Sequence, residues 1–145
     1  MKLLILNGPN LNLLGEREPA VYGRGTLEAL EEDLRAAFPE AAFTFFQSNH
    51  EGALVDRLHA AHRDGTDGVV FNPGAYAHTS LALRDAIAAV APPVVEVHIS
   101  NVYAREDFRQ RLVLSAVCAG VITGLGGAGY HLAVRYLTER PERAG

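Results

Sequence analysis

The sequence predicts a doubly wound α/β domain built on a five-stranded parallel sheet. Five short apolar, β-branched or aromatic runs recur along the chain, and segments of helical periodicity lie between most of them. Near-continuous apolar strands that alternate with helices are typical of a parallel sheet covered on both faces. At 145 residues the chain has the length of one such domain. We therefore expect a single flavodoxin-like domain over residues 1–145, with a short polar tail from about Pro141.

The five runs give the strands, and apolar spacing gives the helices. The strands are expected at residues 2–6, 42–47, 68–71, 94–99 and 120–125. The helices are expected within the segments 26–38, 51–65, 79–93 and 128–140, each with leucines or alanines three or four residues apart. Thr26 is the expected N-cap of the first helix and Thr79 or Ser80 that of the third, which Pro92 and Pro93 stop.

Composition excludes several classes of function. The net charge of -4 shows no basic excess, so a nucleic-acid partner is not expected. No apolar run approaches the ~20 residues that cross a bilayer, and no cleavage site follows the first apolar run, so we expect no membrane association and a cytoplasmic location. The single cysteine, Cys118, lies in an apolar stretch and is expected to be a buried small residue rather than a nucleophile.

Polar residues follow the strands where a parallel α/β sheet binds its ligands. Ligands of this fold lie at the carboxyl ends of the strands. The first strand leads to Asn7 and Asn10, the third to Asn72, and the fourth to His98 and Ser100. This edge carries amides and imidazoles rather than carboxylates.

The sequence argues against three kinds of binding site that are common in proteins of this fold class. A magnesium-dependent phosphoacceptor would need clustered aspartates at the ends of the first and third strands, where this chain has asparagine. A flavin mononucleotide carrier would need a Ser/Thr/Gly phosphate loop after the first strand, which residues 8–15 do not provide. His59 and His62, flanked by arginines on a helix, are more typical of a solvated face than of a metal site, so no metal is expected.

The loop after the first strand carries Arg17 and Tyr22. A free tyrosine has a pKa near ~10, so its ionisation at neutral pH needs a stabilising group such as an adjacent arginine. The loop is long enough to bring the Arg17 guanidinium to the Tyr22 phenol. The alternative is that Tyr22 only packs at the end of the loop while Arg17 is solvated. Spacing alone favours this second interpretation.

Two histidines admit two interpretations each. His98 lies two residues after Glu96 on one strand, so both side chains point to the same face. It is either a core histidine satisfied by that carboxylate or a general acid oriented by it. His78, after the third strand, is either a simple loop residue or a donor to an oxygen-rich ligand.

Four ordered motifs, NGPNLNLLGEREPAVYG, NPGAYAHTS, EVHISN and AREDFR, resemble those of the type II 3-dehydroquinate dehydratases. The resemblance covers nearly the whole chain. It implies a flavodoxin-like domain assembled as a dodecamer of four trimers, which removes water from 3-dehydroquinate to give 3-dehydroshikimate in the third step of the shikimate pathway.

The resemblance also implies roles for single residues. Tyr22 would be the base that removes a proton next to the ketone, and Arg17 would keep it ionised. Asn10 would help to hold a water that stabilises the enolate. His98, oriented by Glu96, would protonate the departing hydroxyl.

The substrate-binding positions follow in the same way. Asn72, His78 and Arg109 would bind substrate hydroxyls, and the backbone of Ile99 and Ser100 would bind the carboxylate. Asp85 would reach into the site of a neighbouring subunit. After Arg109 the chain departs from the family's usual His-Ser-aromatic run and Ser-Pro, with Arg111, Leu112, Val113, Leu114, Ser115 and Ala116 instead.

The expected chemistry needs one base, one acid and polar groups around an oxyanion, and it needs no cofactor. The unrelated type I enzymes work through a lysine imine, whereas the only lysine here, Lys2, begins the first strand at the opposite edge. A non-catalytic flavodoxin-like binder of small anionic ligands is the alternative function.

Overall fold

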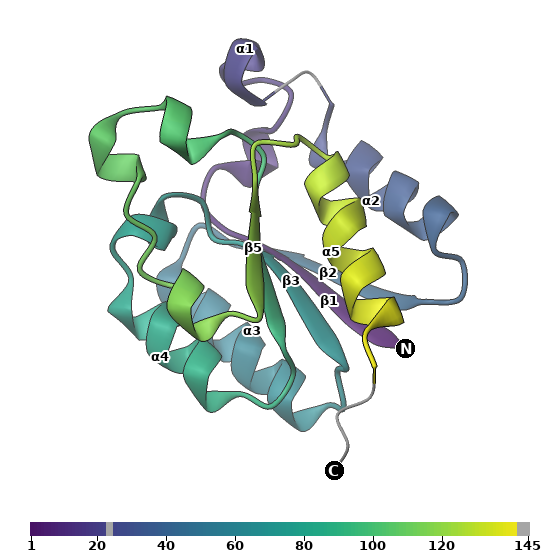
Figure 1. Cartoon of the computed structure of the whole chain (residues 1–145). Coiled ribbons are helices and arrows are strands. Elements are labelled where there is room, and N and C mark those ends of the chain that lie inside the picture. Colours follow the sequence, from purple (N-terminus) through teal and green to yellow (C-terminus); the bar gives the residue numbers. More distant parts are fainter. Residues whose placement is uncertain (23–24, 142–145) are drawn as a thin grey trace.

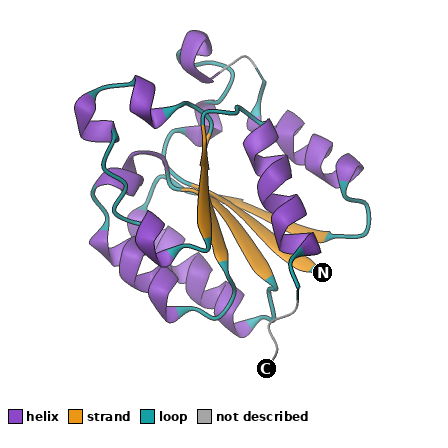
Figure 2. Cartoon of the chain, in the orientation of Figure 1, coloured by secondary structure: helices purple, strands orange, loops and turns teal. Residues whose placement is uncertain are grey.

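The computed structural model confirms a five-stranded, all-parallel sheet in the order β2-β1-β3-β4-β5. It describes residues 1–22 and 25–141, except the side chain of Tyr22. Figure 1 shows the sheet running through the centre of the molecule, and Figure 2 shows helices on both of its sides. The strands are β1 (Lys2–Asn7), β2 (Ala42–Gln47), β3 (Gly68–Asn72), β4 (Val94–His98) and β5 (Gly120–Thr123).

Two helices cover each face of the sheet. The apolar residues of α2 (Leu27–Ala37) and α5 (Ala128–Glu139) pack in one core layer, with Leu34 and Val134 fully buried. Those of α3 (Glu51–Arg63) and α4 (Leu81–Ala89) pack in the second layer, where Leu58 and Leu83 are fully buried. Because the central strands contribute side chains to both layers, the sheet is fixed from both sides.

The helix ends follow local chemistry. The Thr26 hydroxyl accepts a hydrogen bond from the backbone N–H of Ala29, and Ser80 does the same for Leu83, so Ser80 rather than Thr79 is the cap of α4. Strand β5 is shorter than the sequence predicts, because it ends at Thr123 instead of residue 125. Gly124 has φ +89° there, and its N–H donates to the carbonyl of His98, which turns the chain toward α5.

Several short helices complete the carboxyl edge of the sheet, and the sequence did not predict them. The long loop after β1 contains a 3₁₀ turn at Leu11–Leu13 and the short helix α1 (Pro19–Tyr22), which stands above the edge in Figure 1. Further 3₁₀ turns cover Gly74–His78, Val102–Ala104 and Asp107–Arg109, and these segments surround the candidate site. A last 3₁₀ turn, Ser115–Val117, lies at the opposite end of β5, which it precedes.

Candidate active site

The parallel register brings the asparagines of β1 and β3 together. Asn7 pairs with Asn72 across the two strands, at the last position of each. Beyond Asn7 the chain turns at Gly8, where a Cβ atom would lie 2.5 Å from the carbonyl oxygen of Pro73, so only glycine fits without a shift. This close approach leads the β1 loop directly over the end of β3.

Asn10 is held at this turn by its backbone. It has a left-handed conformation with φ 69°, which asparagine tolerates better than most residues. Its N–H donates to Asn49 Oδ1 at 3.0 Å, and Gln47 Nε2 donates to the same oxygen at 3.2 Å and to the Gly8 carbonyl at 3.1 Å. The ends of β1 and β2 are thus tied together beneath the site.

A cavity of about 150 Å³ lies at this edge and contains most of the predicted site residues. It is a small enclosed space by the standard of ligand pockets, which are typically several hundred Å³. Its predicted members are Asn10, Arg17, Asn72, His78, His98, Ile99, Ser100 and Arg109, and the other lining residues are Pro9, Leu11, Gly74, Ala75, Val102 and Arg105.

A short polar contact at the cavity joins Glu96 to His98. Their side chains lie on the same face of β4, and His98 Nε2 is 2.5 Å from Glu96 Oε2. Glu96 is fully buried and His98 is 5% exposed. Since Nε2 is taken by the carboxylate, Nδ1 is the ring nitrogen left for a ligand. The buried carboxylate thus fixes the orientation of the imidazole ring.

His78 lies beside this pair, with its ring centroid 6.5 Å from that of His98. His78 Nδ1 is 2.9 Å from the backbone carbonyl of Arg111. Because a carbonyl only accepts, Nδ1 carries a proton in this contact, and Nε2 is the other polar atom of the ring. The Arg84 guanidinium donates to the carbonyl of Val113 at 2.7 Å. Both contacts use backbone carbonyls of the segment 111–116, so neither depends on which side chains that segment carries.

A buried hydrogen-bond chain orients Asn72, and it includes a residue that the sequence interpretation missed. The Gly74 N–H donates to Asn72 Oδ1 at 3.2 Å, Asn72 Nδ2 donates to the Tyr130 hydroxyl at 2.9 Å, and that hydroxyl donates to Asn7 Oδ1 at 2.6 Å. Tyr130 has no exposed surface, and burial raises its pKa, so it remains a neutral hydroxyl. The available signal was a tyrosine on the apolar face of the last helix.

The sequence analysis also missed three charged residues near the cavity, which are Glu106, Arg105 and Glu18. Arg109 Nε donates to Glu106 Oε2 at 2.6 Å, which aims the arginine. The pKa of Glu106 is lowered by a hydrogen bond from its own backbone and then by Arg109. Arg105 donates to the Ser100 hydroxyl at 3.4 Å and lies 3.8 Å from Glu18, which is 3.7 Å from Arg17. Glu18 thus bridges two arginines, one in the loop and one beyond β4.

Three predicted residues are not among the described residues that line this cavity. Glu96 is fully buried against His98 instead. The backbone of Tyr22 ends α1, but its side chain lies outside the described residues, so its role as a base stays a prediction. Asp85 is exposed on α4 and does not line the cavity of its own chain.

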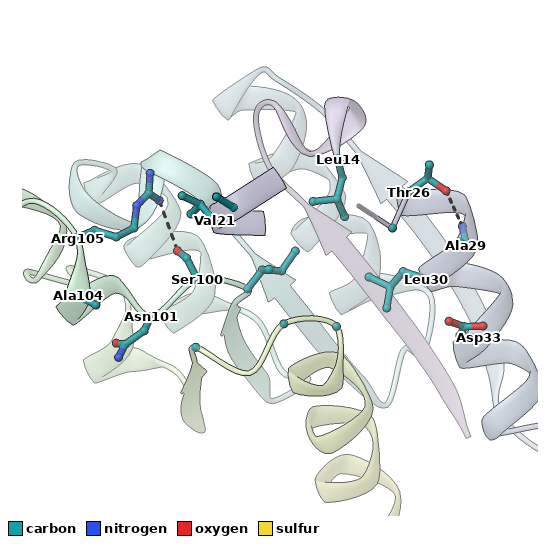
Figure 3. Close-up of a pocket in the computed structure, with 16 residues that line it drawn as sticks. Leu14, Val21, Thr26, Ala29, Leu30, Asp33, Ser100, Asn101, Ala104 and Arg105 are labelled. Carbon is teal, nitrogen blue, oxygen red and sulfur yellow. Dashed lines mark hydrogen bonds between the residues drawn. The ribbon is translucent and has the colours of Figure 1, made fainter. Parts of the chain in front are cut away.

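A larger cavity of about 620 Å³ lies beside the first and shares Ile99, Ser100 and Arg105 with it. Figure 3 shows Val21 of α1 next to Arg105 and Ser100 at its wall.

The structure also bears on the metal-ligating, nucleophilic and membrane-spanning residues considered in the sequence. Among residues 1–22 and 25–141, no group of three His, Cys, Asp or Glu side chains could hold a metal, and His62 Nδ1 accepts the Ala91 N–H. Cys118 is partly buried, and burial and then the Glu96 charge raise its pKa to about 12, which makes it a poor nucleophile. The described part of the chain contains no helix long and apolar enough to cross a membrane.

Comparison with known proteins decides the family. The family described as Dehydroquinase class II matches residues 1–138. The chain belongs to this family. A relative named 3-dehydroquinate dehydratase in Bacillus pumilus is 64% identical over 137 residues, which cover 92% of both chains. One of the same name in Pelodictyon phaeoclathratiforme is 57% identical over 138 residues, covering 94% of this chain and 91% of the relative.

Solved class II dehydroquinase structures agree with the fold. The crystal structure of type II dehydroquinase from Butyrivibrio crossotus superimposes with a TM-score of 0.94 at 46% identity, over 96% of this chain and 98% of the other. That from Propionibacterium acnes gives a TM-score of 0.90 at 42% identity, over 94% of both chains. The predicted resemblance and flavodoxin-like fold are therefore confirmed.

Proposed function

We infer that this class II dehydroquinase is a 3-dehydroquinate dehydratase, a hydro-lyase that converts 3-dehydroquinate to 3-dehydroshikimate in the shikimate pathway. The observation that carries the inference is the buried Glu96–His98 pair, which opens on a small cavity lined by amides and arginines. Such a cavity offers a positioned acid and neutral or positive groups for an anionic, hydroxyl-rich substrate.

The reaction is proposed to proceed in two steps. Tyr22, kept as a phenolate by Arg17, removes a proton from the carbon next to the ketone, and the electron pair moves to the carbonyl oxygen to form an enolate. Asn10 supports a water that donates to this enolate oxygen. The enolate then reforms the ketone as the carbon–oxygen bond to the leaving hydroxyl breaks, and His98 supplies the proton that makes water.

Binding is assigned to the remaining cavity residues. Asn72 and His78 are held in place by their own hydrogen-bond partners, so they are proposed to bind substrate hydroxyls without further ordering. Arg109, aimed by Glu106, joins them. The backbone of Ile99 and Ser100 is proposed to bind the substrate carboxylate.

The assembly is proposed to be a dodecamer of four trimers in the cytoplasm. The exposure of Asp85 on α4 supports a role in the site of a neighbouring subunit, because it does not serve its own. Light scattering on a sizing column measures the assembly. A monomer with full activity would contradict the Asp85 assignment.

The activity is tested by adding 3-dehydroquinate and following the ultraviolet absorbance of the conjugated enone product. The wild-type chain should produce it without added metal or cofactor, and Tyr22→Phe should abolish turnover while ligand binding survives. A folded wild-type protein that binds substrate without forming enone would favour a non-catalytic binder. A fully active Tyr22→Phe variant would reject the base assignment.

A further inference from the structure

The Glu96 carboxylate has a second partner besides His98. Its Oε2 faces the imidazole at 2.5 Å, and its Oε1 accepts a hydrogen bond from the Ser115 hydroxyl at 2.7 Å. Glu96 is 0% exposed, so water does not solvate these oxygens. A buried carboxylate is stable as an anion only when other groups replace the lost water.

Ser115 is well placed for this task. It lies in the 3₁₀ turn Ser115–Val117, which precedes β5 and packs against α4. A hydroxyl that donates to a carboxylate at 2.7 Å makes a charge-assisted bond, roughly twice as strong as one between neutral groups. Ser115 is neutral in every relevant state, so it stabilises the Glu96 charge without competing for the proton of His98.

The Cys118 thiol is the other group near the same oxygen, and it contributes less. Its sulfur is 4.0 Å from Glu96 Oε1, and a thiol is a weak donor. Burial keeps it protonated, as the raised pKa shows. Cys118 therefore provides a matched control, since its removal leaves the short serine bond in place.

We propose that Ser115 is a positioning residue for the acid step: its hydroxyl fixes the Glu96 carboxylate, which in turn orients His98. The contact forms a chain in which Ser115 donates to Glu96, Glu96 accepts from His98 Nε2, and His98 presents Nδ1 to the cavity. This proposal rests on the proposed function, and it assigns no contact between Ser115 and the substrate.

The two chemical steps should respond differently to the loss of this hydroxyl. Proton removal next to the ketone depends on the base in the β1 loop, whereas departure of the hydroxyl depends on His98. Without the Ser115 hydrogen bond the Glu96 carboxylate is less well fixed, so the His98 ring that it orients is less well held. The enolate should then return to substrate more often than it proceeds to product.

The experiment measures this partition in D₂O for the wild type, Ser115→Ala, Ser115→Thr and Cys118→Ala. Enone absorbance gives product formation, and mass spectrometry of unreacted 3-dehydroquinate gives deuterium taken up next to the ketone. For Ser115→Ala we expect kcat to fall about tenfold, as a partial loss of general acid catalysis, with KM within about twofold and the ratio of exchange to product raised about tenfold. Ser115→Thr keeps a hydroxyl and should restore the ratio, and Cys118→Ala should leave it unchanged.

The outcomes separate the proposal from its premise. An unchanged ratio in a folded Ser115→Ala variant, whether its turnover is normal or reduced, overturns the positioning role, because general damage lowers both steps together. Failure of Ser115→Thr to recover the ratio also overturns it. If the wild type forms no enone at all, the proposed function itself is wrong. Thermal unfolding of each variant verifies that it is folded.

Discussion

At the scale of single residues, the site depends on polar side chains whose partners are buried. Glu96, Asn72 and Tyr130 are all nearly or fully inaccessible, and their hydrogen bonds hold the cavity residues His98 and Asn72 in place. Buried networks of this kind are rigid when satisfied and costly when broken. The substrate therefore meets groups that are already oriented.

Tyr130→Phe tests the network beneath Asn72. The change removes the hydroxyl that accepts from Asn72 and donates to Asn7, which leaves buried polar atoms without partners. We expect a loss of about 2 kcal/mol in the free energy of unfolding in urea, together with a raised KM, since Asn72 is no longer held. Tyr136→Phe, on the same helix but 49% exposed, should change the free energy of unfolding by less than about 0.5 kcal/mol. Equal effects in the two variants would contradict the network.

Cys118 gives a prediction in pH. With a folded-state pKa of about 12, only a minute fraction is thiolate at pH 8, whereas an unfolded cysteine with a pKa near ~8.5 is substantially ionised. Alkylation by iodoacetamide should be about a thousandfold slower in the native protein than in guanidinium, and should accelerate about tenfold per pH unit from 8 to 10. Rapid native labelling at pH 8 would contradict this environment. Because folding raises this pKa, the thiol's contribution to stability is present below pH ~8.5 and is lost as pH rises toward 12.

At the scale of elements, ion pairs connect the loop after β1 to the segment that follows β4. Glu18 lies between Arg17 of the loop and Arg105, which follows β4, with N···O distances of 3.7 and 3.8 Å. Glu18 also has a left-handed φ of 39°, unusual for a glutamate. The loop that carries Arg17 and the expected base is thus held over the cavity by interactions that exposed side chains can break and reform.

Glu18→Gln tests this attachment. The variant keeps the shape of the side chain but removes its attraction to both arginines, so the loop should close less readily over substrate. We expect KM to rise about twofold to fivefold with a smaller change in kcat, and the difference from wild type should shrink at high salt. Glu16→Gln removes a charge from the same loop outside the Glu18 bridge and should leave KM within about 1.5-fold. An equal rise in both variants would assign the effect to net charge alone.

The sequence predicted the strands and long helices better than the short helical turns and the side-chain contacts between distant segments. Apolar runs and helical spacing located all five strands and four long helices, because each buries a face that must be apolar. They did not predict α1 or the 3₁₀ turns, which are too short to show a periodicity and depend on contacts distant in the chain. For the same reason Tyr130 and Ser115 were missed: their partners Asn7 and Glu96 are 123 and 19 residues away.

At the scale of the whole molecule, the parallel sheet explains why the cavity lies where it does. All five strands run in one direction, so their ends place Asn7, Asn72 and His98 along a single edge while the two helical layers bury the rest. Lys2 lies at the opposite end of β1, bound to the carbonyl of Asp64. An imine mechanism therefore has no lysine at this edge within the described residues, and borohydride with substrate should not inactivate the protein.

The central claim is that this chain dehydrates 3-dehydroquinate with His98 as the acid. The most direct measurement is the rate of enone formation by the wild type and His98→Asn under saturating substrate. We predict steady product formation by the wild type and a loss of about 10² to 10⁴ in kcat for the variant, with binding retained. Wild-type turnover by His98→Asn, or the absence of enone from a folded, substrate-binding wild type, would contradict the claim.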